Sequence, residues 1–217
     1  MDARTYATLT EVCGWLAGRL SDTVLDAVRV HYSVGEEVLA ESAMLLGLAM
    51  ENVGITAGER ERIRSVLDDP GDPDLDAVPE VARVPPPAFH FVAAPPAAPH
   101  PGRADEVILA QAPRHGGRRV HRTWRVPVDD PDHGTWLYVV EVTPGADVLG
   151  AYSALTSTLN VEARLLWPVE VVTEGASLPP YQAAALTAAR AGRPVSGGRR
   201  VRPPGARSSG RPAGPGG

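Results

Sequence analysis

The chain has 217 residues, of which 43% are hydrophobic and 22% charged, with a net charge of −5. All 21 basic residues are arginine, which excludes a Schiff-base lysine and a P-loop lysine. The single cysteine, Cys13, excludes an intramolecular disulfide, as is typical of a reducing compartment. No apolar run is as long as a membrane span, and the N-terminus has no signal-peptide pattern. We therefore expect a cytoplasmic protein with no membrane partner.

Charge divides the chain into three parts. Residues 1–82 carry 16 acidic residues and 6 arginines, a net charge of −10, whereas residues 83–192 are nearly neutral. Residues 193–217 carry 6 arginines and no acidic residue. The acidic part would repel nucleic acid and anionic membrane, and the basic end could attract either or fold back on the acidic part.

Residues 1–68 predict an acidic four-helix bundle. Apolar residues recur every three or four positions in three stretches, residues 6–20, 24–32 and 38–53. The third stretch is apolar around most of its circumference, which predicts a central position in the bundle. Thr56 and Glu59 form the T-x-x-E capping box that starts a fourth helix. Cys13 lies in the first apolar stretch, where a buried structural thiol is favoured over a nucleophile.

Prolines separate this bundle from a second module. Eight of the 22 prolines lie between Pro79 and Pro101, and we place a Pro- and Asp-rich linker at residues 69–87. Residues 88–192 then alternate between strand and helix patterns. The expected elements are a strand at 88–93, a helix at 103–115, strands at 118–126 and 135–143, a helix from Asp147, a strand at 167–173 and a helix that ends at Gly192.

The order βαββαβ with an additional C-terminal helix predicts a ferredoxin-like domain, which is a four-stranded antiparallel sheet with two helices on one face. The fold class is therefore α+β. If residues 103–115 form a strand instead, the domain becomes a meander with one helical layer. Prolines on both sides of 88–93 predict an edge strand or a neighbour of one, and 135–143, apolar on both faces, predicts a central strand. Residues 193–217 are rich in Gly, Pro, Ser and Arg, which predicts a disordered tail.

The stretch from Arg103 to Leu186 resembles the C-terminal domain of the enhanced-serine-sensitivity (SseB) family. The resemblance rests on a helix that ends near RHGGRRVHRTWRV, the apolar strand TWLYVVEV, a further helix and the segment WPVEVVTEGASLPPY. It covers under half of the chain. It implies a regulatory or interaction role rather than catalysis.

A cluster of basic residues surrounds the first strand of the predicted hairpin. The candidate partner-binding residues are Arg114, Arg118, Arg119, Arg122, Arg125 and His121. Arginines this close together could bind phosphate or an acidic protein surface. They could equally be the solvated face of a strand, or dock on the acidic bundle of the same chain.

Two further groups of residues have structural explanations. Asp129, Asp130, Asp132 and His133 could bind a divalent cation, but they lack the EF-hand glycine and terminal glutamate and are typical of a solvated turn. We therefore predict no metal. Phe89 and Phe91, together with Trp136 and Tyr138, could form an RNA-stacking platform, but the RNP1 pattern is absent and core packing is favoured.

The sequence contains no G-x-S-x-G, H-E-x-x-H, Walker or G-x-G-x-x-G motif. We therefore expect a non-enzymatic cytoplasmic protein-interaction or regulatory module without a cofactor. Its arginine-bearing hairpin or sheet would bind a protein partner, an acidic one being an option, and nucleic acid is not favoured. A sensor of an amino acid or nucleotide is the second hypothesis, and an RNA-binding module the third. Oligomeric state stays open.

Overall fold

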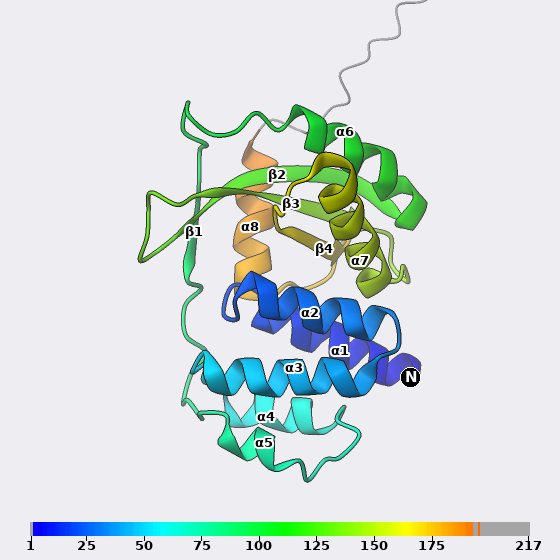
Figure 1. Cartoon of the computed structure of the whole chain (residues 1–217), viewed down its shortest axis with the longest axis vertical. Helices are drawn as coiled ribbons and strands as arrows, with labels where there is room; N and C mark the ends of the chain where they lie inside the picture. Colours follow the sequence, from blue (N-terminus) through cyan, green and yellow to red (C-terminus); the bar gives the residue numbers. More distant parts are fainter. Residues whose placement is uncertain (1, 193–194, 196–217) are drawn as a thin grey trace, which may run out of the picture.

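The computed structural model describes residues 2–192 and Val195 (Figure 1). The tail expected at 193–217 therefore lies, except for Val195, outside the described residues. The described part is a mixed α+β structure in which a four-stranded sheet is flanked by helices, with the N-terminal helices beside one end of the sheet (Figure 1). None of the described helices is both long and apolar enough to cross a membrane.

The N-terminal part contains five helices rather than four. They are α1 (Ala3–Leu16), α2 (Asp22–Ser33), α3 (Glu37–Met50), α4 (Ala57–Arg64) and α5 (Pro73–Ala77). The predicted capping box is confirmed, because the Thr56 side chain accepts from the Glu59 backbone N–H and the Glu59 carboxylate accepts from the Thr56 backbone N–H. Each side chain thus satisfies a helix-terminal donor that would otherwise lack a partner.

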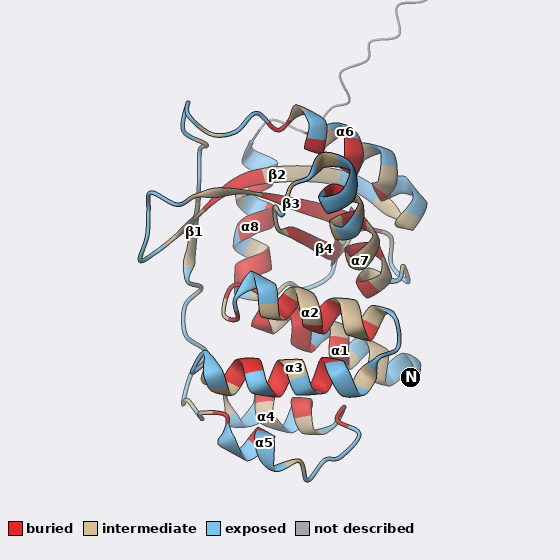
Figure 2. Cartoon of the chain, in the orientation of Figure 1, coloured by how far each residue is buried: buried red, intermediate tan, exposed pale blue. Residues whose placement is uncertain are grey.

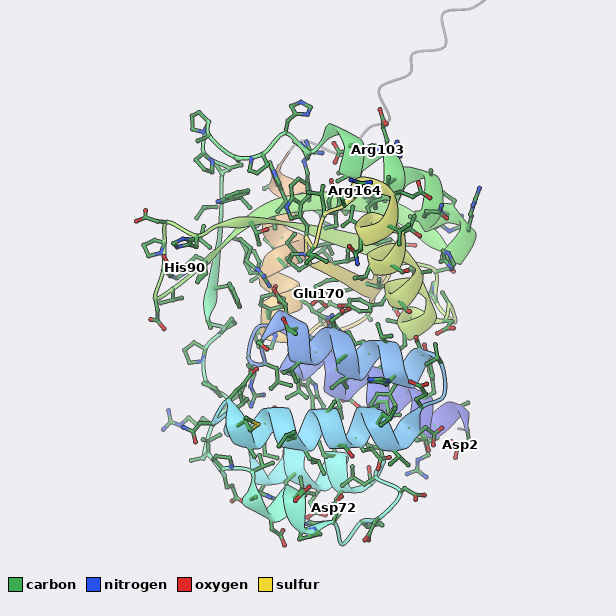
Figure 3. The ribbon with its side chains drawn as sticks, in the orientation of Figure 1. Asp2, Asp72, His90, Arg103, Arg164 and Glu170 are labelled. Carbon is green, nitrogen blue, oxygen red and sulfur yellow. The ribbon has the colours of Figure 1, made fainter. Side chains whose placement is uncertain are left out.

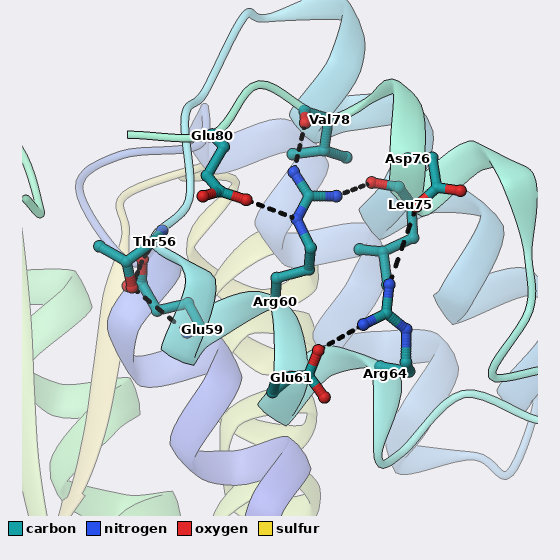
Figure 4. A network of polar contacts seen from close by, with 9 residues as sticks. All are labelled: Thr56, Glu59, Arg60, Glu61, Arg64, Leu75, Asp76, Val78 and Glu80. Atoms are coloured by element: carbon teal, nitrogen blue, oxygen red, sulfur yellow. Dashed lines mark hydrogen bonds and ion pairs between the residues drawn. The ribbon is translucent and has the colours of Figure 1, made fainter. Parts of the chain in front are cut away.

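Residues expected to form a linker pack against α4. Within 69–87, Asp72 caps the short helix α5, and Leu75 and Val78 are buried. The Arg60 guanidinium donates to the backbone carbonyls of Leu75 and Val78 (Figure 4). The backbone around Val78 is thereby fixed to α4, so residues 73–78 belong structurally to the helical part.

The elements expected in the second module are confirmed in number and order. They are β1 (Phe89–Val92), α6 (Gly102–Gln111), the 3-10 turn η1 (Ala112–His115), β2 (Gly117–Pro127), β3 (Thr135–Val142), α7 (Val148–Thr158), the π-helical turn η2 (Leu159–Ala163), β4 (Val169–Thr173) and α8 (Pro180–Ala191). Residues 103–115 are helical, as the first alternative predicted. Asp147 caps α7 by accepting from the Gly150 backbone N–H.

The antiparallel ferredoxin-like sheet is a wrong prediction. The strand order is β1-β2-β3-β4, with β1–β2 and β2–β3 antiparallel and β3–β4 parallel. A ferredoxin-like sheet would require β1 to pair on both edges, but β1 has only four residues and prolines on both sides. It is an edge strand, as those prolines predicted, and β3 is central, as predicted.

Helices cover both faces of the sheet, so a single-sided arrangement is also wrong. Side chains of α6 and α7 share a core with Tyr138, Val140 and Val171. On the opposite face, Leu137, Val139 and Val172 belong to one continuous core with α8 and the N-terminal helices. Figure 2 shows β3 and β4 buried along most of their length.

The predicted central position of α3 is confirmed only in part. It lies between α2 and α5, which pack against it from two sides, but Leu46 and Met50 on a further side are exposed (Figure 1). The helices α1 and α2 lie between α3 and β4 (Figure 1). The N-terminal helices therefore do not enclose a core of their own but share one with the sheet.

Candidate functional site: a cleft beside the open edge of β4

The predicted basic cluster is divided between the two faces of the sheet, because alternate side chains of β2 point to opposite faces. Arg125 faces α8 and the N-terminal helices, where it is 4% exposed. It donates to both carboxylate oxygens of Asp22 on α2 and to the Tyr181 hydroxyl, and its guanidinium carbon lies 4.1 Å from the centre of the Phe89 ring. This supports the intramolecular alternative for Arg125: it joins β2 to the acidic helical part.

The other members of the predicted cluster are mostly paired within the chain. Arg122 lies on the α6 face and pairs with Asp105. His121 contacts buried Glu141 at 2.8 Å. Burial raises the pKa of Glu141, but hydrogen bonds from Arg190 and His121 outweigh it, so the pKa is lowered overall. The three exposed members are Arg114, Arg118 and Arg119, of which Arg119 pairs with Glu174 and Arg114 with Gln111.

The acidic turn at residues 129–133 is exposed to solvent, and three of the four aromatic residues considered above pack against helices. His133 is exposed and hydrogen-bonded to Asp130 at 2.7 Å, which raises its pKa, and no described residues form a cluster of three or more potential metal ligands. Phe91 packs edge-on against Tyr181 of α8, with ring centres 5.3 Å apart. Tyr138 is fully buried and donates to Asp105. Phe91 and Tyr138 therefore pack under helices, whereas half-buried Trp136 packs edge-on against Trp124 and donates its indole N–H to the Pro99 carbonyl.

A cleft of about 620 Å³ lies between α1 and β4. One wall is α1, including Cys13, Gly14 and Trp15, and the opposite wall is β4 with the loop that leads to α8. The start of α7 also lines the cleft, as do Arg19 and Glu59. The cleft is therefore built jointly by the N-terminal helices and the sheet. Arg29 and Glu170, which join these two parts, are 141 residues apart in the sequence.

The floor of the cleft is a closed polar network. Arg29 of α2 donates to both oxygens of Glu170 on β4, at 3.1 and 2.9 Å, and both residues are buried (Figure 3 labels Glu170). Gln182 of α8 donates to the same carboxylate at 2.7 Å, and the Arg29 guanidinium also lies 4.6 Å from the centre of the Tyr152 ring. Burial alone would lower the pKa of Arg29, but the charge of Glu170 raises it, so Arg29 stays charged and is paired with the Glu170 carboxylate.

The network also fixes the orientation of the Gln182 amide. The Glu170 carboxylate can only accept, so the amide nitrogen of Gln182 must face it, and the amide oxygen is turned away. That oxygen lies against α1 at Gly14, where an added Cβ would be 3.3 Å from it. It accepts no hydrogen bond from any described residue. An acceptor on a buried side chain is therefore left available at the cleft.

The other charged groups at the cleft are paired within the chain, although Arg19 Nε has no hydrogen-bond partner among the described residues. Arg19 pairs with Glu59 and donates to the Gly54 carbonyl at 2.6 Å. Burial raises the pKa of Cys13 to about 11, so the thiol stays protonated at neutral pH, consistent with a structural role. The cleft thus offers no uncommitted charge to attract an ionic ligand.

The β4 edge of the cleft has unpaired backbone groups. The Pro168 carbonyl and the Glu174 N–H bond to β3, so by alternation the backbone groups of Val171 and Thr173 face away from β3. No described residue bonds to the N–H or C=O of Val171 or to the N–H of Thr173. Buried backbone groups are almost always paired with protein or water, so these three require a partner in the cleft.

The chain has no significant match among protein-family models, curated proteins or solved structures. The resemblance to the SseB family stays a prediction. The sequence contains one signal for this site, the charged residues Arg29 and Glu170 within apolar stretches. Arg29 interrupts the apolar stripe of α2, and Glu170 interrupts the apolar segment VEVV of β4. Because charged residues are rarely buried unless they are paired, each of them indicates a buried partner of opposite charge.

Proposed function

We propose that the protein is a non-enzymatic interaction module that binds an extended segment of a partner protein as a further strand on the open edge of β4. The observation that carries the proposal is the set of unpaired backbone groups of Val171 and Thr173 in the cleft. Strand addition satisfies such groups with main-chain hydrogen bonds and takes its specificity from pockets for alternate side chains. This keeps the sheet of the second module as the binding surface but transfers the role from the arginines to β4.

The chemistry of the cleft supports a neutral, partly apolar peptide. Both arginines that line it are neutralised by glutamates, so a phosphate or carboxylate ligand finds no free counter-charge. Trp15, Leu178 and Val172 supply apolar contacts for side chains, and the Gln182 oxygen supplies an acceptor. A main chain offers both donors and acceptors and needs no counter-charge.

The size of the cleft favours a peptide as the ligand over a free amino acid. A cavity of about 150 Å³ holds one benzene ring, and the cleft, at about 620 Å³, is roughly four times as large. A single amino acid would leave most of it filled with water. Several residues of an extended chain would fill it, and this favours the peptide over the small-ligand sensor.

The experiment is a selection of random heptapeptides by the full chain, followed by affinity measurement on three forms of the protein. Thr173→Pro removes one free edge donor without removing a β3–β4 hydrogen bond, and Thr173→Ala is the matched control that keeps the donor. One lost hydrogen bond is worth about 0.5–1.5 kcal/mol, or roughly 2- to 12-fold in affinity, and the proline ring also obstructs the edge.

We expect a selected peptide to bind the wild type and Thr173→Ala alike and Thr173→Pro at least about tenfold more weakly. N-methylation of alternate peptide amides should abolish binding in one register only, because only every second amide of an added strand faces β4. Failure to select such a peptide, or equal binding to Thr173→Pro, would refute the proposal. Saturable binding of a free amino acid in the cleft would establish the sensor instead.

A further inference from the structure

The outer face of α3 is an apolar stripe with no partner among the described residues. Val38, Leu39, Leu46 and Met50 are 66%, 53%, 58% and 76% exposed, and Val34, just before the helix, is 62% exposed. The four positions on α3 recur at helical spacing along one face, over roughly 18 Å at 1.5 Å per residue, with the exposed Ser42 between them. Figure 2 shows exposed segments along α3.

This clustering distinguishes the stripe from ordinary surface residues. Among residues 2–192 and Val195, ten large hydrophobic residues are exposed, of which five lie between positions 34 and 50 and five are scattered over residues 84–166. Single exposed apolar side chains are normal, but a contiguous apolar patch on a soluble protein marks an interaction site. The stripe is therefore the strongest candidate for a second docking surface.

The surroundings of the stripe are acidic. No arginine or lysine occurs in residues 30–59. The helices that pack on either side of α3 are α2 and α5; Glu36 and Glu51 cap the two ends of α3, and Asp72 and Asp74 lie at the start of α5. An apolar strip between acidic margins is complementary to a helix whose apolar face is flanked by lysine or arginine.

Charge argues against two other occupants, and composition argues against a third. A second copy would place acidic margins against acidic margins, which is unfavourable. An anionic membrane would be repelled. The Arg-rich residues 196–217 have the required charge, but Val201 is the one large apolar residue among them, so that segment could not cover the stripe.

We infer that the outer face of α3 binds an amphipathic, basic helix of a partner protein. The apolar face of that helix would lie along Leu46 and Met50, and its cationic side chains would face the acidic margins. Met50 suits this role because an unbranched thioether side chain adapts to differently shaped partners. This surface is separate from the cleft beside β4, so the two proposals can fail independently.

The test uses three synthetic 18-residue peptides: a helix with a leucine face and lysine flanks, the same helix with glutamate flanks, and a scrambled lysine version. Affinity is measured by fluorescence anisotropy against the full chain at low and high salt. Leu46→Ser with Met50→Ser disables the stripe without touching the core, because both side chains are exposed. Val161→Ser with Leu166→Ser is the matched control at two exposed apolar positions elsewhere.

We expect the lysine-flanked helix to bind, with at least about a tenfold loss in the double variant on α3, no change in the control, and weaker binding at high salt. Thr173→Pro should leave this binding unchanged. Equal binding of the glutamate-flanked or scrambled peptide, or no binding, would overturn the inference. So would self-association, or binding to vesicles, that the α3 double variant abolishes, because each would identify a different occupant.

Discussion

Arg29→Met should cost far more stability than an exposed arginine-to-methionine change, because it leaves Glu170 buried beside one remaining hydrogen bond, from Gln182. Removing one partner of a buried ion pair costs about 3–5 kcal/mol. A domain of this size has a total stability of about 5–15 kcal/mol, so the variant loses a large part of it. Arg103→Met is the matched control: its pair with Glu106 is exposed on both sides and is worth at most about 1 kcal/mol.

The measurement is urea unfolding of the full chain, monitored in parallel by tryptophan fluorescence and by far-ultraviolet circular dichroism. We expect coincident transitions, since Arg29 joins α2 to β4 and one core contains residues from the helices and the sheet. The double variant Arg29→Met, Glu170→Leu should recover most of the loss, because it removes both buried charges. A single-variant cost equal to that of Arg103→Met would refute the buried ion pair, and separate transitions would refute the shared core.

Three further changes test other parts of the structure. Thr56→Ala should cost about 1 kcal/mol in urea unfolding through loss of its helix cap, and an unchanged midpoint would contradict that cap. Gly18→Ala should cost about 2–5 kcal/mol, because φ is +74° and the new Cβ would lie 2.2 Å from the Tyr181 ring; Gly35→Ala, with φ +78° and open space, should cost only about 1–2 kcal/mol. Burial raises the pKa of Glu41, so folding favours its protonated form and stability falls as pH rises through the folded pKa. Glu41→Gln should therefore raise the melting temperature at pH 7 and not at pH 3.

Local structure in this chain could be predicted from sequence because its signals are local. The Thr56 capping box, the Asp147 cap and the prolines around β1 each act within a few residues, and each prediction is confirmed. Strand pairing is not local. Nothing in the periodicity of residues 167–173 distinguishes a strand that pairs in parallel with β3 from one that pairs antiparallel elsewhere.

The position of α3 shows where a pattern can mislead. Its residues are apolar around most of the helix, which is typical of a central helix. Periodicity reports how much apolar surface a helix presents, but not whether that surface meets its own chain or a partner. The exposed apolar residues of α3, which the pattern alone did not place at the surface, are therefore the basis of the docking surface that we propose.

The candidate site could not be assembled from sequence because its parts are brought together only by the shared core. Edge strands expose unpaired backbone groups and are commonly protected by a covering helix. Here α1 and α2 take that position beside β4 and are held there by Arg29 and Glu170, yet the cleft keeps them away from Val171 and Thr173. A helix that fully covered the edge would have made a more stable protein with nowhere for an added strand to bind. The gap between α1 and β4 is thus the feature of this fold on which the proposed strand addition depends most directly.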